Sequence, residues 1–133
     1  MTTSFEYEKR DYIRLPISVA VKYTFLSQEV SGPEIDTIHE GTTSNIGSGG
    51  LMLTAELPDT DWLGLLLTRR MHVGVKIFLP GSERPAKSLC RAAWASALDD
   101  KGGLVLGLCL QEITQEDRDR ITSHIIEAQL PGE

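Results

Sequence analysis

Alternation of apolar and polar residues is the strongest pattern in the chain, and it begins abruptly at Leu15. From Leu15 to Phe25 every odd position carries an apolar or aromatic side chain, while the even positions hold Pro16, small residues or polar ones. A period of two is typical of a half-buried β-strand, and a proline is tolerated at the start of one. The segment from Met71 to Leu79 alternates in the same way and predicts a second such strand, ending at a Pro-Gly turn.

Shorter apolar segments between turn signals predict the remaining strands. A more polar strand at 35–44 follows the Gly32-Pro33 turn and can pair antiparallel with the first strand. Segments 86–98 and 104–112 flank a short polar connection and predict a hairpin. The other predicted strand is 51–57, and the stretch 59–68 fits either a short helix or a strand.

The last regular element is an amphipathic helix at about 114–128. Thr114 provides an N-cap hydroxyl three residues before the carboxylate of Asp117, and Ile121, Ile125 and Ala128 recur on one face. About six short strands and a terminal helix predict an all-β fold, a small six-stranded antiparallel barrel with a C-terminal α-helix. Residues 1–14 lack apolar periodicity and are expected to form a flexible arm ahead of a single domain at 15–133.

Composition limits the class of protein. At 133 residues, with 41% apolar and 24% charged side chains, one domain can bury enough surface to fold without a metal or disulfide. No apolar run reaches the roughly 20 residues of a membrane span, and the first residues do not resemble a secretory signal. We therefore expect a cytoplasmic protein with no membrane span.

The net charge of −6 is unevenly distributed. Residues 25–68 carry seven acidic and no basic groups, whereas residues 69–110 carry seven basic and three acidic ones. Non-specific nucleic-acid binding requires many lysines and arginines on one surface, so DNA and RNA are not expected as partners. A small anion needs only a few of these cations.

The two cysteines carry no sign of a metal site, because neither belongs to a CxxC pair or a cluster of ligand residues. If Leu98 faces Leu104 in the hairpin, Ala93 faces Cys109, and Cys90 lies on the other side of the sheet. Strand parity then disfavours a disulfide.

Arg10 and Arg14 lie four residues apart where the expected arm meets the first strand, with Lys9 beside them. A guanidinium presents a planar fork of donors that suits two phosphate oxygens or the O6 and N7 edge of guanine. The alternative is a pair of solvated arginines that contact Glu8 and Asp11.

The segment from Asn45 to Gly50 is the richest loop signal in the chain, with three glycines among its last four residues. It fits either a flexible hairpin connection or a backbone that a ligand can approach closely, with the Asn45 amide as donor and acceptor. It is not a nucleoside-triphosphate phosphate loop, because no Gly-Lys-Ser/Thr follows it.

Taken together, the order of these motifs and elements resembles the PilZ domain family over residues 9–126. Members of that family have a six-stranded barrel and commonly bind the bacterial second messenger cyclic di-GMP. They do so through an RxxxR motif, which Arg10 and Arg14 match, and a [D/N]xSxxG motif, whose ends match Asn45 and Gly50. The resemblance implies a cyclic di-GMP site that includes Lys9, Arg10, Arg14, Asn45, Gly47 and Gly50, with no other cofactor.

Gly47 departs from the family pattern, which has serine at this position. If the missing hydroxyl donates to the ligand, its absence costs about 0.5–1.5 kcal/mol of binding free energy. Binding is weakened by this argument and not abolished.

Other residues offer no chemistry of their own. His39, His72 and His124 are scattered over two strands and the helix without a nucleophile motif, and both Trp62 and Trp94 are expected in the core, with base stacking as the alternative. No catalytic residue is predicted.

The leading hypothesis is a stand-alone cyclic di-GMP receptor that signals to an unidentified protein partner when its arm orders. A PilZ-like protein–protein adaptor that binds no nucleotide is the alternative, and a small flavin-dependent barrel enzyme is a third.

Overall fold

The computed structural model describes residues 14–15, 18–47, 49–99, 101 and 103–129. The elements in these residues are β1 (Arg14–Leu15), β2 (Val19–Leu26), β3 (His39–Gly47), β4 (Gly50–Glu56), α2 (Trp62–Leu67), β5 (His72–Ile77), β6 (Ala86–Ala97), β7 (Gly103–Ile113) and α3 (Gln115–Gln129).

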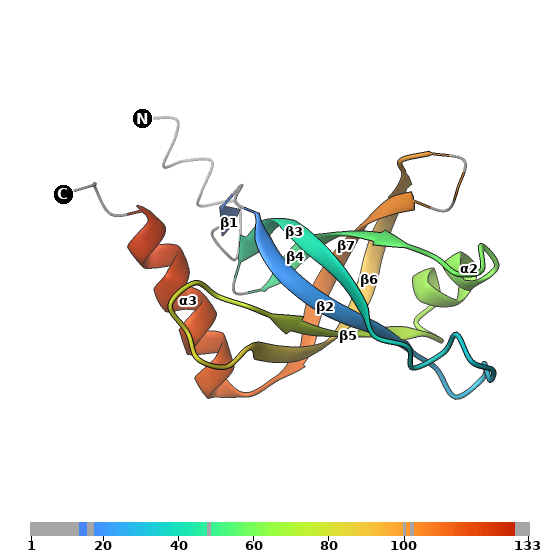
Figure 1. The fold of residues 1–133 in the computed structure, drawn as a ribbon, viewed down its shortest axis with the longest axis horizontal. Coiled ribbons are helices and arrows are strands. Elements are labelled where there is room, and N and C mark those ends of the chain that lie inside the picture. Colours follow the sequence, from blue (N-terminus) through green and yellow to red (C-terminus); the bar gives the residue numbers. More distant parts are fainter. Residues whose placement is uncertain (1–13, 16–17, 48, 100, 102, 130–133) are drawn as a thin grey trace.

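All the strand pairs are antiparallel, and the sheet closes on itself. The order is β1-β3-β2-β5-β6-β7-β4, and a further pairing of β3 with β4 completes the ring. Within the described residues β2 to β7 thus form a closed six-stranded barrel with the expected C-terminal helix, as Figure 1 shows. β1 and β2 pair with the same edge of β3. β2 pairs with the first residues of β3, and β1 pairs with its last residues. The single first strand expected from Leu15 is therefore divided into β1 and β2.

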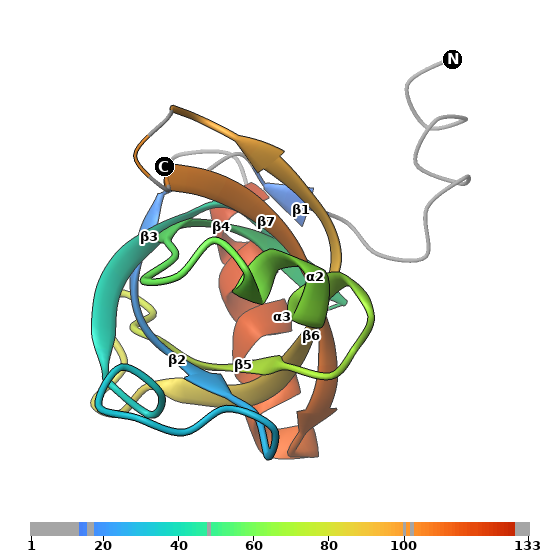
Figure 2. The same cartoon turned by 90° about the vertical axis from the view of Figure 1, so that its right-hand side faces the viewer.

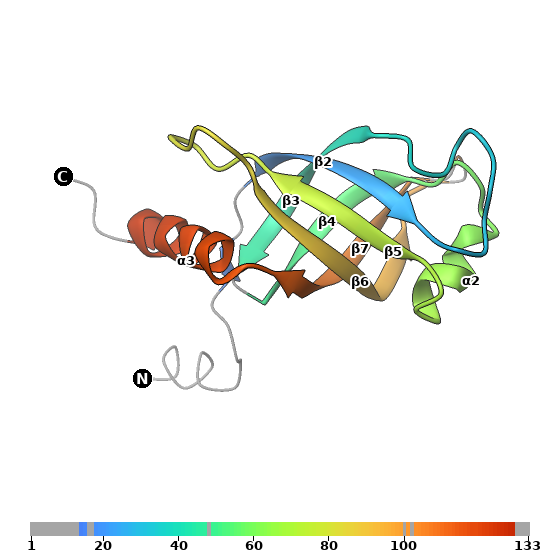
Figure 3. The same cartoon turned by 90° about the horizontal axis from the view of Figure 1, so that it is seen from below.

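The barrel interior is filled by the alternating positions of all six strands, and a helix covers each end. Figure 2 looks along the barrel, with α2 in front and α3 behind, and Figure 3 shows the two helices at opposite ends. Trp62 and Leu66 of α2, and Ile121 and Ile125 of α3, are buried against this core. The ambiguous stretch 59–68 is therefore a helix, because its apolar residues close the mouth of the barrel. No helix in the described part of the chain is long and apolar enough to cross a membrane.

The β6–β7 hairpin is confirmed, but its predicted register is wrong. Ala97, not Leu98, faces Leu104, and Arg91, not Ala93, faces Cys109. The offset begins at the turn, where the N–H of Leu98 donates to the carbonyl of Gly103 at 2.9 Å, and register shifts at Ala92/Trp94 and Leu89/Cys90 change the alignment again. A β-bulge adds an unpaired residue to one strand, which moves every later pair by one position.

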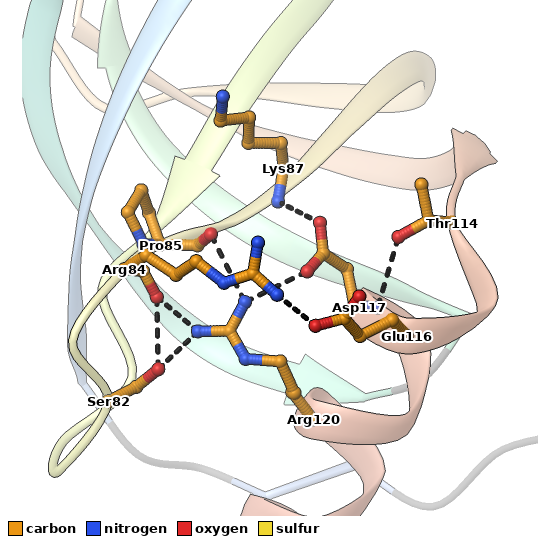
Figure 4. A network of polar contacts seen from close by, with 8 residues as sticks. All are labelled: Ser82, Arg84, Pro85, Lys87, Thr114, Glu116, Asp117 and Arg120. Carbon is orange, nitrogen blue, oxygen red and sulfur yellow. Dashed lines mark hydrogen bonds and ion pairs between the residues drawn. The ribbon is translucent and has the colours of Figure 1, made fainter.

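Helix α3 is held in place at its N-terminus by the predicted cap and by ion pairs. The Thr114 hydroxyl accepts a hydrogen bond from the N–H of Asp117 at 3.1 Å. Arg120 pairs with Asp117 at 2.8 Å, and Arg84 from the β5–β6 loop pairs with Glu116. Figure 4 shows this network, in which Asp117 also accepts the backbone N–H of Lys87. Burial opposes ionisation of Asp117, but these donors lower the pKa of its carboxyl.

Candidate functional site

The β3–β4 hairpin is tighter than the sequence predicts. Asn45 and Gly47 belong to β3 and Gly50 begins β4, so the expected six-residue loop is reduced to the connection between Gly47 and Gly50. Inside the hairpin Ile46 faces Leu51, and both side chains are fully buried. Because side chains alternate along a strand, Asn45, Gly47 and Gly50 occupy outward-facing positions, although both glycines are buried and Asn45 is only partly exposed.

Backbone pairing brings the two predicted motifs together. Arg14 of β1 is the register partner of Gly47, and on the other side of the hairpin Gly50 is the partner of Cys109. Cys109 in turn faces Arg91 of β6. We call this line of positions, Arg14, Gly47, Gly50, Cys109 and Arg91, the arginine row. Arg10 and Lys9 lie outside the described residues.

A second line of outward positions runs beside the first. Asn45 faces Met52, Met52 faces Gly107, and Gly107 faces Trp94. This set, the tryptophan row, crosses β3, β4, β7 and β6. Both rows therefore occupy one continuous outer face of the barrel.

Two β-bulges produce the tryptophan row. Ser44 is the extra residue between Thr43 and Asn45, and Ala93 is the extra residue between Ala92 and Trp94. Thr43 and Ala92 point inward and are buried, so without the bulges the side chains two positions later would point inward as well. The bulges turn the Asn45 amide and the Trp94 indole outward, and bulges often re-aim side chains in this way beside functional sites.

The amide of Asn45 has an unmet hydrogen-bond acceptor. Its Nδ2 lies 3.7 Å from the sulfur of Met52, which is a weak acceptor, while its Oδ1 is buried without a partner in the residues described. A buried acceptor without a donor costs about 1–3 kcal/mol. A donor supplied to Asn45 from outside the described residues would remove this cost.

Trp94 lies against the backbone of Gly107. A Cβ at position 107 would come within 2.1 Å of the indole Nε1 and 2.2 Å of Cε2, so only glycine fits. The ring nevertheless stays 42% exposed. The expectation of a core residue is therefore wrong for Trp94 and confirmed for Trp62, which is 5% exposed.

Sequence reasoning did not identify Arg91 as a member of this face, and it named base stacking by Trp94 only as the alternative to a core position. Arg91 is half-buried and has no ion pair to a carboxylate among the described residues. The strand register that places Arg91 opposite Cys109 depends on the β-bulges, and no sequence pattern predicts where these bulges occur. Gly107 in the middle of a strand was the available signal, because such a glycine often marks a close approach of another group.

Among the described residues the outer face carries an indole ring, a guanidinium group and an amide whose oxygen has no partner. Within the described residues no cluster of three histidine, cysteine or acidic side chains could hold a metal. His39 stacks on Tyr23 with ring centroids 5.1 Å apart, a packing role that agrees with the sequence expectation. An exposed indole ring and an arginine are suited to a flat, anionic ligand.

Comparison with solved structures identifies the fold. The inhibitor of motility MotI/DgrA of Bacillus subtilis aligns with 91% of this chain at 14% identity and a TM-score of 0.60, and this chain spans 51% of that protein. The PilZ domain of CeSA from a cellulose-synthesising bacterium aligns with 89% of this chain and 99% of its own, at 14% identity and a TM-score of 0.53. The PilZ domain of Escherichia coli YcgR, solved with c-di-GMP, aligns with 90% of both chains at 13% identity and a TM-score of 0.54.

These matches establish a PilZ-like fold for the chain, as its motifs imply. No protein-family model and no curated protein matches the sequence.

The two cysteines give a direct chemical test of the face. Both are free thiols, and burial raises the pKa of Cys90 to about 12, whereas Cys109 is half-exposed on the arginine row. A pKa near 12 leaves roughly one thiol in ten thousand ionised at pH 8, and only the thiolate is nucleophilic. We expect iodoacetamide to modify Cys109 in the native protein and Cys90 only after unfolding, as read by peptide mass mapping. Modification of native Cys90 at the rate of Cys109 would contradict the predicted inward and outward faces.

Proposed function

We propose that this PilZ-like domain is a receptor for cyclic di-GMP, which binds on the outer face formed by the arginine row and the tryptophan row. The observation that carries the proposal is the backbone pairing of Arg14 with Gly47. It joins the RxxxR segment to the glycine hairpin, although the two are far apart in the sequence. A structural neighbour, the PilZ domain of YcgR, was solved with the same nucleotide.

The chemistry of the face suits this ligand. Cyclic di-GMP carries two phosphates and two guanine bases, and guanidinium groups can contact both phosphate oxygens and the guanine O6 and N7 atoms. In the proposal, Arg10 and Arg14 act as this clamp, with Lys9 beside them. The exposed ring of Trp94 offers a stacking surface for a base. Gly47 and Gly50 are buried but place no side chain on this face, so a ligand that reaches them would meet backbone.

A cation on each side of the hairpin would help an acidic protein hold an anion. Arg14 and Arg91 occupy the two ends of the arginine row. A ligand bound over the row would therefore have a positively charged residue at each end. The net charge of −6 slows the approach of an anion but does not prevent binding at a locally positive face.

Signalling would follow from the position of the arm. Arg10 and Lys9 precede β1, so a ligand that recruits them orders the segment at about 6–14 and changes the surface offered to a protein partner in the cytoplasm. The ligand can shift the equilibrium between two states of the arm by no more than the ratio of its affinities for them. The nucleotide is bound and released unchanged in this account.

A PilZ-like adaptor without nucleotide binding is the second candidate. Gly47 favours it, because the position lacks the hydroxyl of the family motif. In this case the same outer face would contact protein and no cyclic di-GMP.

Calorimetric titration with cyclic di-GMP separates the two candidates. Charge-assisted hydrogen bonds contribute about 1.5–3 kcal/mol each, so we expect micromolar or tighter binding that weakens about ten- to a hundredfold in Arg14→Ala and in Arg10→Ala. Arg69→Ala is the matched control, since it removes the same charge from an exposed position after α2.

No heat at high micromolar nucleotide would favour the adaptor. Equal binding by all three variants would show that Arg10 and Arg14 do not form the clamp. Recovery of a linearised nucleotide would instead reveal an enzyme.

Restoring the family serine tests the role of the hairpin. Gly47 ends β3 in backbone register with Arg14, a strand position that serine can adopt. Gly47→Ser is therefore expected to tighten binding of cyclic di-GMP by about two- to tenfold, the value of one hydrogen bond. Because Gly47 is buried, the melting temperature is measured beside binding, which separates a loss of stability from a loss of contact. Weaker binding with unchanged melting would show that the serine of the family motif has no equivalent role here.

A further inference from the structure

We propose that three lysines on the outer surface of β2, β5 and β6 form a docking site for an acidic segment of a protein partner. Lys22 of β2 faces Lys76 of β5, and Lys76 faces Lys87 of β6. We call these three residues the lysine row. They lie on strands other than β3, β4 and β7, and all three side chains are exposed.

This arrangement is unfavourable in the free protein. Like charges directly opposite one another on neighbouring strands repel, and Lys76 has a lysine on each side. Among the described residues no carboxylate lies within ion-pair distance of any of the three ammonium groups, and Lys22 instead lies 5.7 Å from the ring centroid of Phe78. A bound anion would relieve the repulsion.

The two carboxylates of α3 that line the groove are engaged elsewhere, and Glu40 faces Lys22 across β2 and β3. Glu116 pairs with Arg84, and Asp117 pairs with Arg120 and accepts the backbone N–H of Lys87. Figure 4 shows the Lys87 side chain extending away from both carboxylates. The network at the start of α3 thus holds the backbone of Lys87 in place, but it does not neutralise the charge of the lysine side chains.

The lysine row lines a groove of about 1030 Å³ over β2, β5 and β6. Besides the paired groups, Glu112 is the acidic side chain in its lining, and Leu26 and the 63% exposed Ile38 provide an apolar end. Glu40 continues the row beyond Lys22. The positive area is therefore short, bounded by acidic groups and joined to an apolar patch.

These dimensions favour a peptide segment over a long polyanion. Three adjacent strands span roughly 10 Å, and alternate side chains of an extended peptide are about 7 Å apart. Two carboxylates at positions i and i+2 can therefore reach the row, while an apolar residue on the same face, at i+4, reaches Ile38. A nucleic acid or an anionic membrane would extend over the acidic boundary and meet repulsion.

The test is titration of the full chain, without nucleotide, with a synthetic peptide that carries glutamates at positions i and i+2 and a leucine at i+4, monitored by amide NMR shifts. Because exposed ion pairs are weak and screened by salt, we expect a high-micromolar dissociation constant that rises with salt. Shifts should concentrate at the lysine row. Each of Lys22→Gln, Lys76→Gln and Lys87→Gln should weaken binding about two- to fivefold, and the triple variant more than tenfold.

Two controls make the outcome decisive. Lys101→Gln removes an exposed lysine from the β6–β7 turn and should bind like the unmodified chain, and a peptide with glutamine in place of glutamate should not bind. Absence of binding, shifts away from the row, or equal binding by the triple variant would overturn the proposal. Tighter binding of duplex DNA or of phosphatidylserine vesicles at the row would overturn the assignment of the occupant. None of these results depends on Arg10 or Arg14, so the receptor proposal is tested separately.

Discussion

Pairing of β3 with β4 closes the barrel, and this register decides which side chains face outward. The buried pair Ile46 and Leu51 fixes the hairpin from within, since a slip of one residue would exchange the apolar and polar faces of both strands. With that pair in place, Gly47 and Gly50 flank the turn, Arg14 pairs beside it, and Cys109 lies next to Gly50. The candidate ligand face is thus a consequence of how the core is packed.

Much of the fold could be predicted from the sequence, because period-two alternation and a capped helix are local signals. The strand at Met71 to Leu79 and the Thr114 cap are examples, and the structure contains β5 and α3 at these places. The inward or outward direction of Trp94 could not be predicted. It depends on one extra residue, Ala93, whose unpaired position follows from the partner strand and not from its own side chain.

The residues of the candidate site also fall into two groups: those that a local motif predicts and those that only strand register brings together. Asn45, Gly47 and Gly50 were readable as a motif, and Arg14 as a guanidinium beside the first strand, but their mutual contact follows from strand pairing across the sequence. Arg91 and Trp94 join them only through the register of β6 with β7. The lysine row also emerges from register, since Lys22, Lys76 and Lys87 are far apart in the chain. An acidic protein thereby carries two separate positive features, which suits one face for a small ligand and another for a partner.

The fluorescence of Trp94 tests whether the bulge at Ala93 presents this side chain to the nucleotide. Trp62→Phe leaves Trp94 as the sole tryptophan and keeps an aromatic ring beside Phe25, whose centroid lies 5.5 Å from that of Trp62. Titration with cyclic di-GMP should quench Trp94 saturably, since guanine would stack on the exposed indole, and Arg14→Ala should shift the curve to higher concentration. Binding detected by calorimetry in the same variant with no change in Trp94 emission would contradict the account.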